Sequence, residues 1–96
     1  MALVSVKGDP NTDGNGALLA DTQTKVKIGG LLIVCVTSNA SADNLCPIVG
    51  GEHCNPKAVT GSANVKIGGL SIHRHGDGRS CGASTIVTGQ TKVKIG

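Results

Sequence analysis

The stretch Val26-Lys27-Ile28-Gly29 occurs again as Val65-Lys66-Ile67-Gly68 and as Val93-Lys94-Ile95-Gly96. A chain of 96 residues that carries one tetrapeptide three times is best interpreted as a repeat architecture. Polar and apolar side chains alternate in each copy, which is the period of a half-buried strand. We therefore expect the valine and isoleucine of each copy to face the interior and the lysines to face solvent.

Each copy closes a unit that begins with its own apolar stretch, at residues 3–9, 31–36 and 70–77. Glycine pairs follow two of the copies and permit a sharp turn into the next strand. No helical periodicity runs through three turns of the chain. The sequence predicts an all-β fold, a single domain over residues 1–96, in which three similar units wrap one axis as a small three-sided prism or cone.

The composition indicates a narrow interior. The chain has no Phe, Tyr or Trp, so its core is built from Val, Ile, Leu, Ala and Cys. A domain of this size leaves much of its surface wet and keeps open strand edges. We expect a metal ion, disulfides or a partner protein to supply the missing stability.

Several classes of function are disfavoured. The longest apolar run, residues 31–36, is far shorter than a membrane-spanning helix, and no signal peptide is visible. The net charge of +3 is spread over the repeats, which indicates a solvated face rather than a nucleic-acid surface. No nucleophile and base form a recognisable pair, so we predict neither an enzyme nor a small-molecule substrate.

A zinc site is predicted where the loops of the three units meet. Asp13 and Cys81 each follow an aspartate of their own unit by four residues, and the longer middle unit inserts further ligand types. Thiolate sulfur and imidazole nitrogen are the ligands that zinc prefers, four in a tetrahedron. A bound ion would stabilise a small core. The predicted ligands are Cys46, His53, Cys54 and Cys81.

The cysteines also permit other interpretations. Cys46 and Cys54 are close enough in sequence to form a local disulfide instead of binding zinc. Cys81 could be a small buried residue, although its place beside a glycine favours a ligand. Cys35 lies in an apolar run and is predicted to fill the core.

The fourth ligand has alternatives as well. Asp13 could donate an oxygen, or it could simply be a turn residue before Gly14. His73 and His75 form an i, i+2 pair that matches Ser5 and Lys7 in register, so we expect both to project outward or toward a partner. In the alternative interpretation one of them, such as His75, completes the zinc site.

The chain resembles the PAAR-repeat proteins over its whole length. The resemblance depends on residues 71–77, on Ser80-Cys81-Gly82 and on residues 89–96. Arg74, Gly76 and Asp77 keep the family's pattern, while residues 71–73 are Ser-Ile-His in place of Pro-Ala-Ala. Residues 3–14 resemble the start of the family, except that Asp13 stands where the family often has histidine.

The resemblance implies a function. PAAR proteins are small β cones that sit, one per trimer, on trimeric β-helical spikes of type VI secretion systems and contractile phage tails. The cone sharpens the spike for membrane puncture, and a zinc ion near its apex holds the tip together. Cys81 matches the family's C-terminal cysteine ligand, Cys46 and His53 fall where its central-loop ligands lie, and Cys54 is taken to replace the missing histidine.

The implied location is a virion tail tip or baseplate, or a bacterial cytoplasm from which a secretion machine ejects the chain. The implied partner is the spike trimer, with transient contact to a target membrane and none with nucleic acid. A free-standing zinc-binding module, such as a metal carrier or sensor, is the alternative function.

Overall fold

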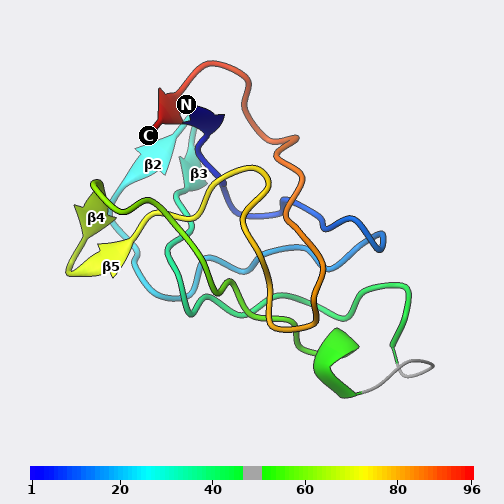
Figure 1. The fold of residues 1–96 in the computed structure, drawn as a ribbon. Helices are drawn as coiled ribbons and strands as arrows, with labels where there is room; N and C mark the ends of the chain where they lie inside the picture. The colour runs from blue at the N-terminus through cyan, green and yellow to red at the C-terminus, as the bar shows by residue number, and fades with distance from the viewer. Residues whose placement is uncertain (47–50) are drawn as a thin grey trace.

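The strands form three separate antiparallel pairs that lie together at one end of the molecule (Figure 1). The computed structural model describes residues 1–46 and 51–96. The pairs are β1 with β6, β2 with β3, and β4 with β5. Their bounds are β1 Ala2–Leu3, β2 Lys27–Ile28, β3 Leu31–Leu32, β4 Lys66–Ile67, β5 Leu70–Ser71 and β6 Lys94–Ile95. Within the described residues the helical element is one 3₁₀ turn, η1 at Gly51–His53. The all-β prediction is confirmed.

The three strand pairs share one register. Ile28 lies opposite Leu31 and Ile67 lies opposite Leu70, each across a two-glycine turn whose residues all have positive φ. This conformation is the hairpin turn that glycine favours. In the third pair Ile95 lies opposite Ala2, so the two ends of the chain meet where the other pairs have their turn, as Figure 1 shows.

A closed ring of backbone hydrogen bonds joins the three units. Ser5 N donates to His73 O at 3.0 Å, His73 N donates to Val34 O at 2.9 Å, and Val34 N donates to Ser5 O at 2.9 Å. Each unit therefore donates one bond and accepts one, in the order first, third, second and back to the first. Such closure leaves these backbone groups paired although the side chains of all three residues are fully buried.

Two further sets of backbone hydrogen bonds occur once in each unit, and the first set links the units in the opposite direction. The bonds from Lys7 N to Leu32 O, Val36 N to Ser71 O and His75 N to Leu3 O measure 2.8, 2.9 and 2.9 Å. Equivalent bonds further along each unit run from Gly8 N to Leu18 O, Thr37 N to Ala58 O and Gly76 N to Thr85 O. The three-sided prism stays an interpretation, and this three-fold repetition of hydrogen bonds is the observation that favours it.

The core is aliphatic and divides into two clusters. One contains Val4, Ile33, Cys35 and Ile72, against which the isoleucines of all three tetrapeptides pack. The other comprises Leu18, Ala20, Val34, Ala40 and Ala58. The prediction that Cys35 fills the core is confirmed, because its side chain is fully buried in the first cluster.

The expected orientation of the tetrapeptides is only partly correct. The isoleucines are half-buried, as expected, but Val26 and Val93 are 40% and 41% exposed. Strand pairing begins one residue later, at Lys27 and Lys94. The two valines therefore precede the paired segments, and the inward and outward alternation of a strand does not extend to them.

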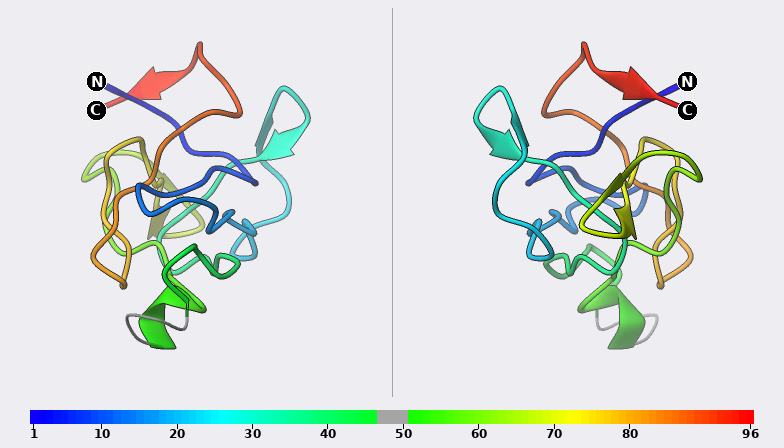
Figure 2. Two further views of the ribbon diagram at one scale, coloured as in Figure 1. Left: turned by 90° about the vertical axis from the view of Figure 1, so that its right-hand side faces the viewer. Right: turned by 90° about the vertical axis from the view of Figure 1, so that its left-hand side faces the viewer.

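The molecule is elongated, with principal extents of 34 × 24 × 23 Å. In Figure 1 the strand pairs and both chain termini lie at one end and η1 lies at the other, and both views of Figure 2 place the termini and η1 far apart. None of the helical structure described for residues 1–46 and 51–96 has the length and apolar character needed to cross a bilayer.

Candidate metal centre

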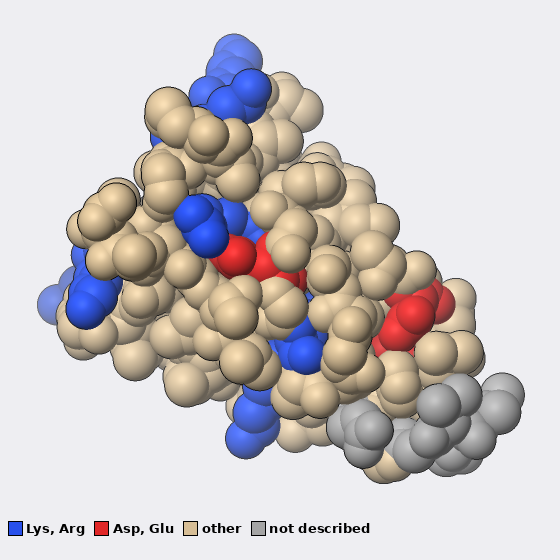
Figure 3. All heavy atoms as spheres, in the orientation of Figure 1, with Lys and Arg blue, Asp and Glu red and all other residues tan. Residues whose placement is uncertain are grey.

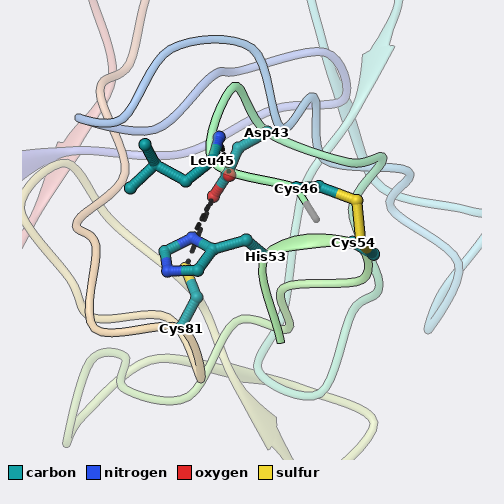
Figure 4. Close-up of a disulfide and its surroundings, with 6 residues drawn as sticks. All are labelled: Asp43, Leu45, Cys46, His53, Cys54 and Cys81. Carbon is teal, nitrogen blue, oxygen red and sulfur yellow. Dashed lines mark hydrogen bonds and ion pairs between the residues drawn. A yellow bond between two sulfur atoms is a disulfide. The ribbon is translucent and has the colours of Figure 1, made fainter. Parts of the chain in front are cut away.

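Four possible ligands meet near η1, at the end away from the strand pairs. They are Asp13, Asp43, His53 and Cys81, and their ligand atoms all lie within 4.8 Å of one another. His53 Nδ1 is 2.9 Å from Asp43 Oδ2 and 3.5 Å from Asp13 Oδ2. Cys81 Sγ lies 3.7 Å from the same Asp43 oxygen. In Figure 4 the side chains of Asp43, His53 and Cys81 point toward one another.

Two of these residues occupy equivalent turns in the first and third units. Asp13 precedes Gly14 and Cys81 precedes Gly82, and both glycines have a φ of 89°. Gly14 N donates to the carbonyl of Asn11 at 3.1 Å, and Gly82 N donates to that of Arg79 at 3.0 Å. The residue that closes each turn has a left-handed backbone conformation, which glycine adopts without strain.

The middle unit supplies the other two ligands, Asp43 from near the register position that matches Asp13 and Cys81, and His53 from the extra segment that follows. Asp43 N donates to His53 O at 2.9 Å, which ties the two ligand-bearing segments together. A disulfide joins Cys46 to Cys54, with their Cα atoms 4.9 Å apart. Figure 4 shows this disulfide beside the His53 side chain.

Asp43 is the best-connected ligand. Its side chain is fully buried, and besides His53 it accepts hydrogen bonds from Asn11 Nδ2 at 3.0 Å and Leu45 N at 2.9 Å. Burial acts to raise the pKa of Asp43, but the bonds from His53, Leu45 and Asn11 outweigh it, and the pKa is held below the usual 3.8. Asp43 is therefore a fixed negative charge at neutral pH.

The pKa of the Cys81 thiol is shifted toward the neutral form, in contrast to that of Asp43. Burial, followed by the neighbouring charges of Asp43 and Asp13, raises the pKa of its thiol above 9.0, although a backbone hydrogen bond from Ala83 acts against this. A metal cation would reverse these effects, because it favours the thiolate. Binding would displace the thiol proton, and metal affinity would fall as pH decreases.

Arg79 places a positive charge beside this anionic group. Its side chain is buried, and its guanidinium donates to Thr85 Oγ1 at 2.8 Å, to Asp9 O at 2.9 Å and to Gly16 O. None of these acceptors is charged. Burial lowers the pKa of Arg79, while Cys81, Asp9 and Asp43 act to raise it. An arginine stays protonated at neutral pH, so it partly offsets the charge of the ligands.

The ligand spacing can accommodate a metal ion. Tetrahedral zinc with bonds of about 2.0 to 2.3 Å requires neighbouring ligand atoms to lie about 3.3 to 3.8 Å apart. The measured pairs at 2.9, 3.5 and 3.7 Å lie close to this range. One nitrogen, one sulfur and two carboxylate oxygens form a donor set that could hold such an ion.

The predicted ligand set requires correction. His53 and Cys81 lie in the cluster, whereas Cys46 and Cys54 are joined to each other. A disulfide sulfur is not a thiolate, so this oxidised form has no metal ligand at either position. The structure realises the disulfide that the sequence had left open as an alternative.

The structure distinguishes the two other candidates for the fourth ligand, Asp13 and His75. Asp13 lies in the cluster, and His75 does not belong to it. The His75 ring is exposed, and its Nδ1 accepts a hydrogen bond from Val87 N at 3.0 Å. Sequence reasoning missed Asp43. The repeats pointed close to it. Ser38 matches the aspartates that precede Asp13 and Cys81 by four residues, and the position four after Ser38 is Ala42, next to Asp43.

The expectation that His73 projects outward is wrong. Its side chain is fully buried, with Nδ1 2.7 Å from Thr60 O and Nε2 2.6 Å from Thr85 Oγ1. The residue occupies the hydrogen-bonded ring with Ser5 and Val34, where each unit turns its side chain inward. Matching His73 to Ser5 was correct, but Ser5 itself is buried.

No protein-family model matches this chain, and no curated protein matches it.

Proposed function

We propose that this chain is a structural tip that caps a trimeric β-helical spike of a contractile injection machine, with its loops clamped by zinc. The observation that carries the proposal is the closed ring of hydrogen bonds among Ser5, Val34 and His73. One chain with three equivalent sides matches the symmetry of a trimer without breaking it. The proposal gives the chain no catalytic step.

The end that carries the strand pairs is suited to such a partner. Short paired strands leave backbone donors and acceptors on their outer edges, which can accept further strands. A groove at this end is lined by Ile28, Gly29 and residues 90–93, and Val93 at its edge is 41% exposed. Lysines flank the groove, and in Figure 3 basic side chains appear over the strand pairs. This end therefore combines apolar contact with positive charge.

The opposite end is suited to be the point. Asp13, Asp43, His53 and Cys81 come from loops of all three units, so an ion bound there would tie the three sides together. Zinc is the metal that we assign, because imidazole nitrogen and thiolate sulfur are its preferred ligands. A clamp of this kind resists the separation of the loops under load, whether on a phage tail or on an ejected tip that meets a membrane.

The test is co-expression of this chain with a trimeric β-helical spike protein encoded beside it. Size-exclusion chromatography with light scattering is expected to give a complex of one chain per trimer. Val93→Asp should abolish the complex, whereas Val59→Asp, at another exposed valine, should leave it intact. A chain that stays monomeric beside a correctly assembled trimer would refute the proposal.

A free-standing metal module is the second candidate. The side chain of Asp13 is 27% exposed, so one ligand is open to solvent, as a metal carrier requires. Rapid loss of zinc to a weak chelator, together with a stable monomer that ignores the spike, would favour this function. Retention of zinc over hours would favour the tip.

A further inference from the structure

The Cys46–Cys54 disulfide joins two short turns, each of which carries one of the four candidate ligands. Cys54 directly follows His53, and Cys46 follows Asp43 by three residues. Cys46 N donates to Asp43 O at 3.2 Å, and Cys54 N donates to Gly51 O at 3.0 Å. Each half of the disulfide therefore belongs to the same short turn as one ligand.

Few other described bonds hold these two turns against each other. They are linked by the backbone bond from Asp43 N to His53 O and by the side-chain contact of 2.9 Å between the same residues. By contrast, Asp13 and Cys81 are positioned by turns of the first and third units. Asp43 is also held by Asn11 Nδ2 and Leu45 N. The disulfide therefore acts mainly on His53, by constraining how its turn lies against the turn of Asp43.

We propose that the Cys46–Cys54 disulfide is a redox-sensitive clamp on the metal site, so that oxidation tightens metal binding and reduction weakens it. This inference rests on the proposed metal site. Two thiols become one disulfide as two electrons and two protons pass to an oxidant of the disulfide class. A thiol or phosphine reductant reverses the step and restores both thiols.

The expected size of the effect follows from loop closure. The two cysteines are eight residues apart, and closing a loop of that length restricts the free chain enough to change an equilibrium by roughly tenfold to a hundredfold. Without the clamp, part of the binding free energy must hold the His53 turn against Asp43 before the two side chains can share an ion. A chain built this way would hold metal more firmly after it leaves a reducing compartment for an oxidising one.

Zinc affinity should be measured on the full chain in two states, oxidised and reduced with a phosphine, by competition with a chromogenic zinc chelator. A double variant with Cys46→Ser and Cys54→Ser removes the clamp without offering new thiolates. The reduced chain and the double variant are expected to bind zinc roughly tenfold to a hundredfold more weakly than the oxidised chain. The affinity of the double variant should not respond to the reductant.

Equal affinity in the oxidised and reduced states would overturn the inference. So would tighter binding after reduction, because that result would mean that the released thiols have become ligands. Absence of zinc binding by the oxidised chain would overturn the metal site itself, and with it the proposed clamp at the tip. The comparison of the two redox states uses one unchanged sequence, so it decides the question even if the double variant folds poorly.

Discussion

Mild acidification should destabilise this protein through the buried imidazole of His73. The Thr60 carbonyl can only accept a hydrogen bond, so His73 Nδ1 carries the proton and Nε2 accepts from the Thr85 hydroxyl. That hydroxyl in turn accepts from Arg79 Nε at 2.8 Å. A second ring proton would remove the acceptor at Nε2 and place a cation beside Arg79.

The direction of the effect follows from the surroundings of the ring. Burial lowers the pKa of His73 below 6.5, and the positive charges of Arg79 and Arg74 lower it further. The hydrogen bond to Thr60 and the negative charge of Asp77 act in the opposite direction but do not outweigh burial. As pH falls through 6.5, the unfolded chain takes up a proton that the folded chain refuses. The free energy of unfolding therefore decreases as pH falls. The contribution of the neutral His73 ring to stability is complete only above pH 6.5.

The loss of stability on acidification is limited because His73 takes up a single proton. Each bound proton changes the free energy of unfolding by about 1.4 kcal/mol per pH unit, so the loss from about pH 7.5 to about pH 5 reaches at most about 2 kcal/mol. Asp21, Asp43 and Asp77 also have lowered pKa values, but they lose their contribution only as pH falls toward and below 3.8. The window above about pH 5 therefore lies clear of the loss from these three carboxylates.

Urea denaturation at a series of pH values measures this slope. His73→Gln should flatten the pH dependence over this window, whatever it does to absolute stability. Val59→Ala, at a 55% exposed site that does not titrate, should keep the slope of the wild-type chain. An unchanged slope in His73→Gln would refute the reasoning about this buried ring.

Three further predictions concern the core, the metal site and the backbone. Val34→Ala should lower the free energy of unfolding by about 2 to 3 kcal/mol, because two methyl groups are removed from a fully buried site. Val59→Ala, at a 55% exposed site, should change it by less than about 0.5 kcal/mol. Urea denaturation compares the two variants, and equal losses would contradict the assigned core. Asp43→Asn should weaken zinc binding by more than about a hundredfold in chelator competition, while the exposed Asp21→Asn, whose partner is Asn39, should bind as the wild type does. Thr37 has a φ of 71° at the position where the other two units carry Gly8 and Gly76, so Thr37→Gly should raise stability by about 1 kcal/mol, whereas Thr24→Gly should lower it.

The fold class and much of the core could be predicted from the repeats alone. The tetrapeptides mark all three strand pairs, and the isoleucines pack as their spacing predicts. The orientation of His73 could not be predicted, because strand periodicity assumes one wet face. Here the three segments bond to one another in a closed ring, and residues that would be outward in an open sheet point into the molecule.

The candidate site was predicted only in part for a similar reason. His53 and Cys81 were found from residue type, since histidine and cysteine are the usual zinc ligands. Whether Cys46 and Cys54 are thiolates or a disulfide depends on how close the insertion brings them, and sequence spacing does not fix that distance. Asp43 was missed because an aspartate in a loop is common, and only the equivalence of the units distinguishes it.

The pairing of the two chain ends has a consequence for how the polypeptide is connected. Ile95 and Ala2 face each other as Ile28 and Leu31 do across a glycine turn, so the break between them is one of three interchangeable positions on a ring. A gene permuted to start at Gly30 or Gly69, with residue 96 spliced to residue 1 through a short glycine link, should reach the same native state. Cargo fused to residue 1 or to residue 96 would emerge beside the strand pairs and leave the end that carries η1 uncovered.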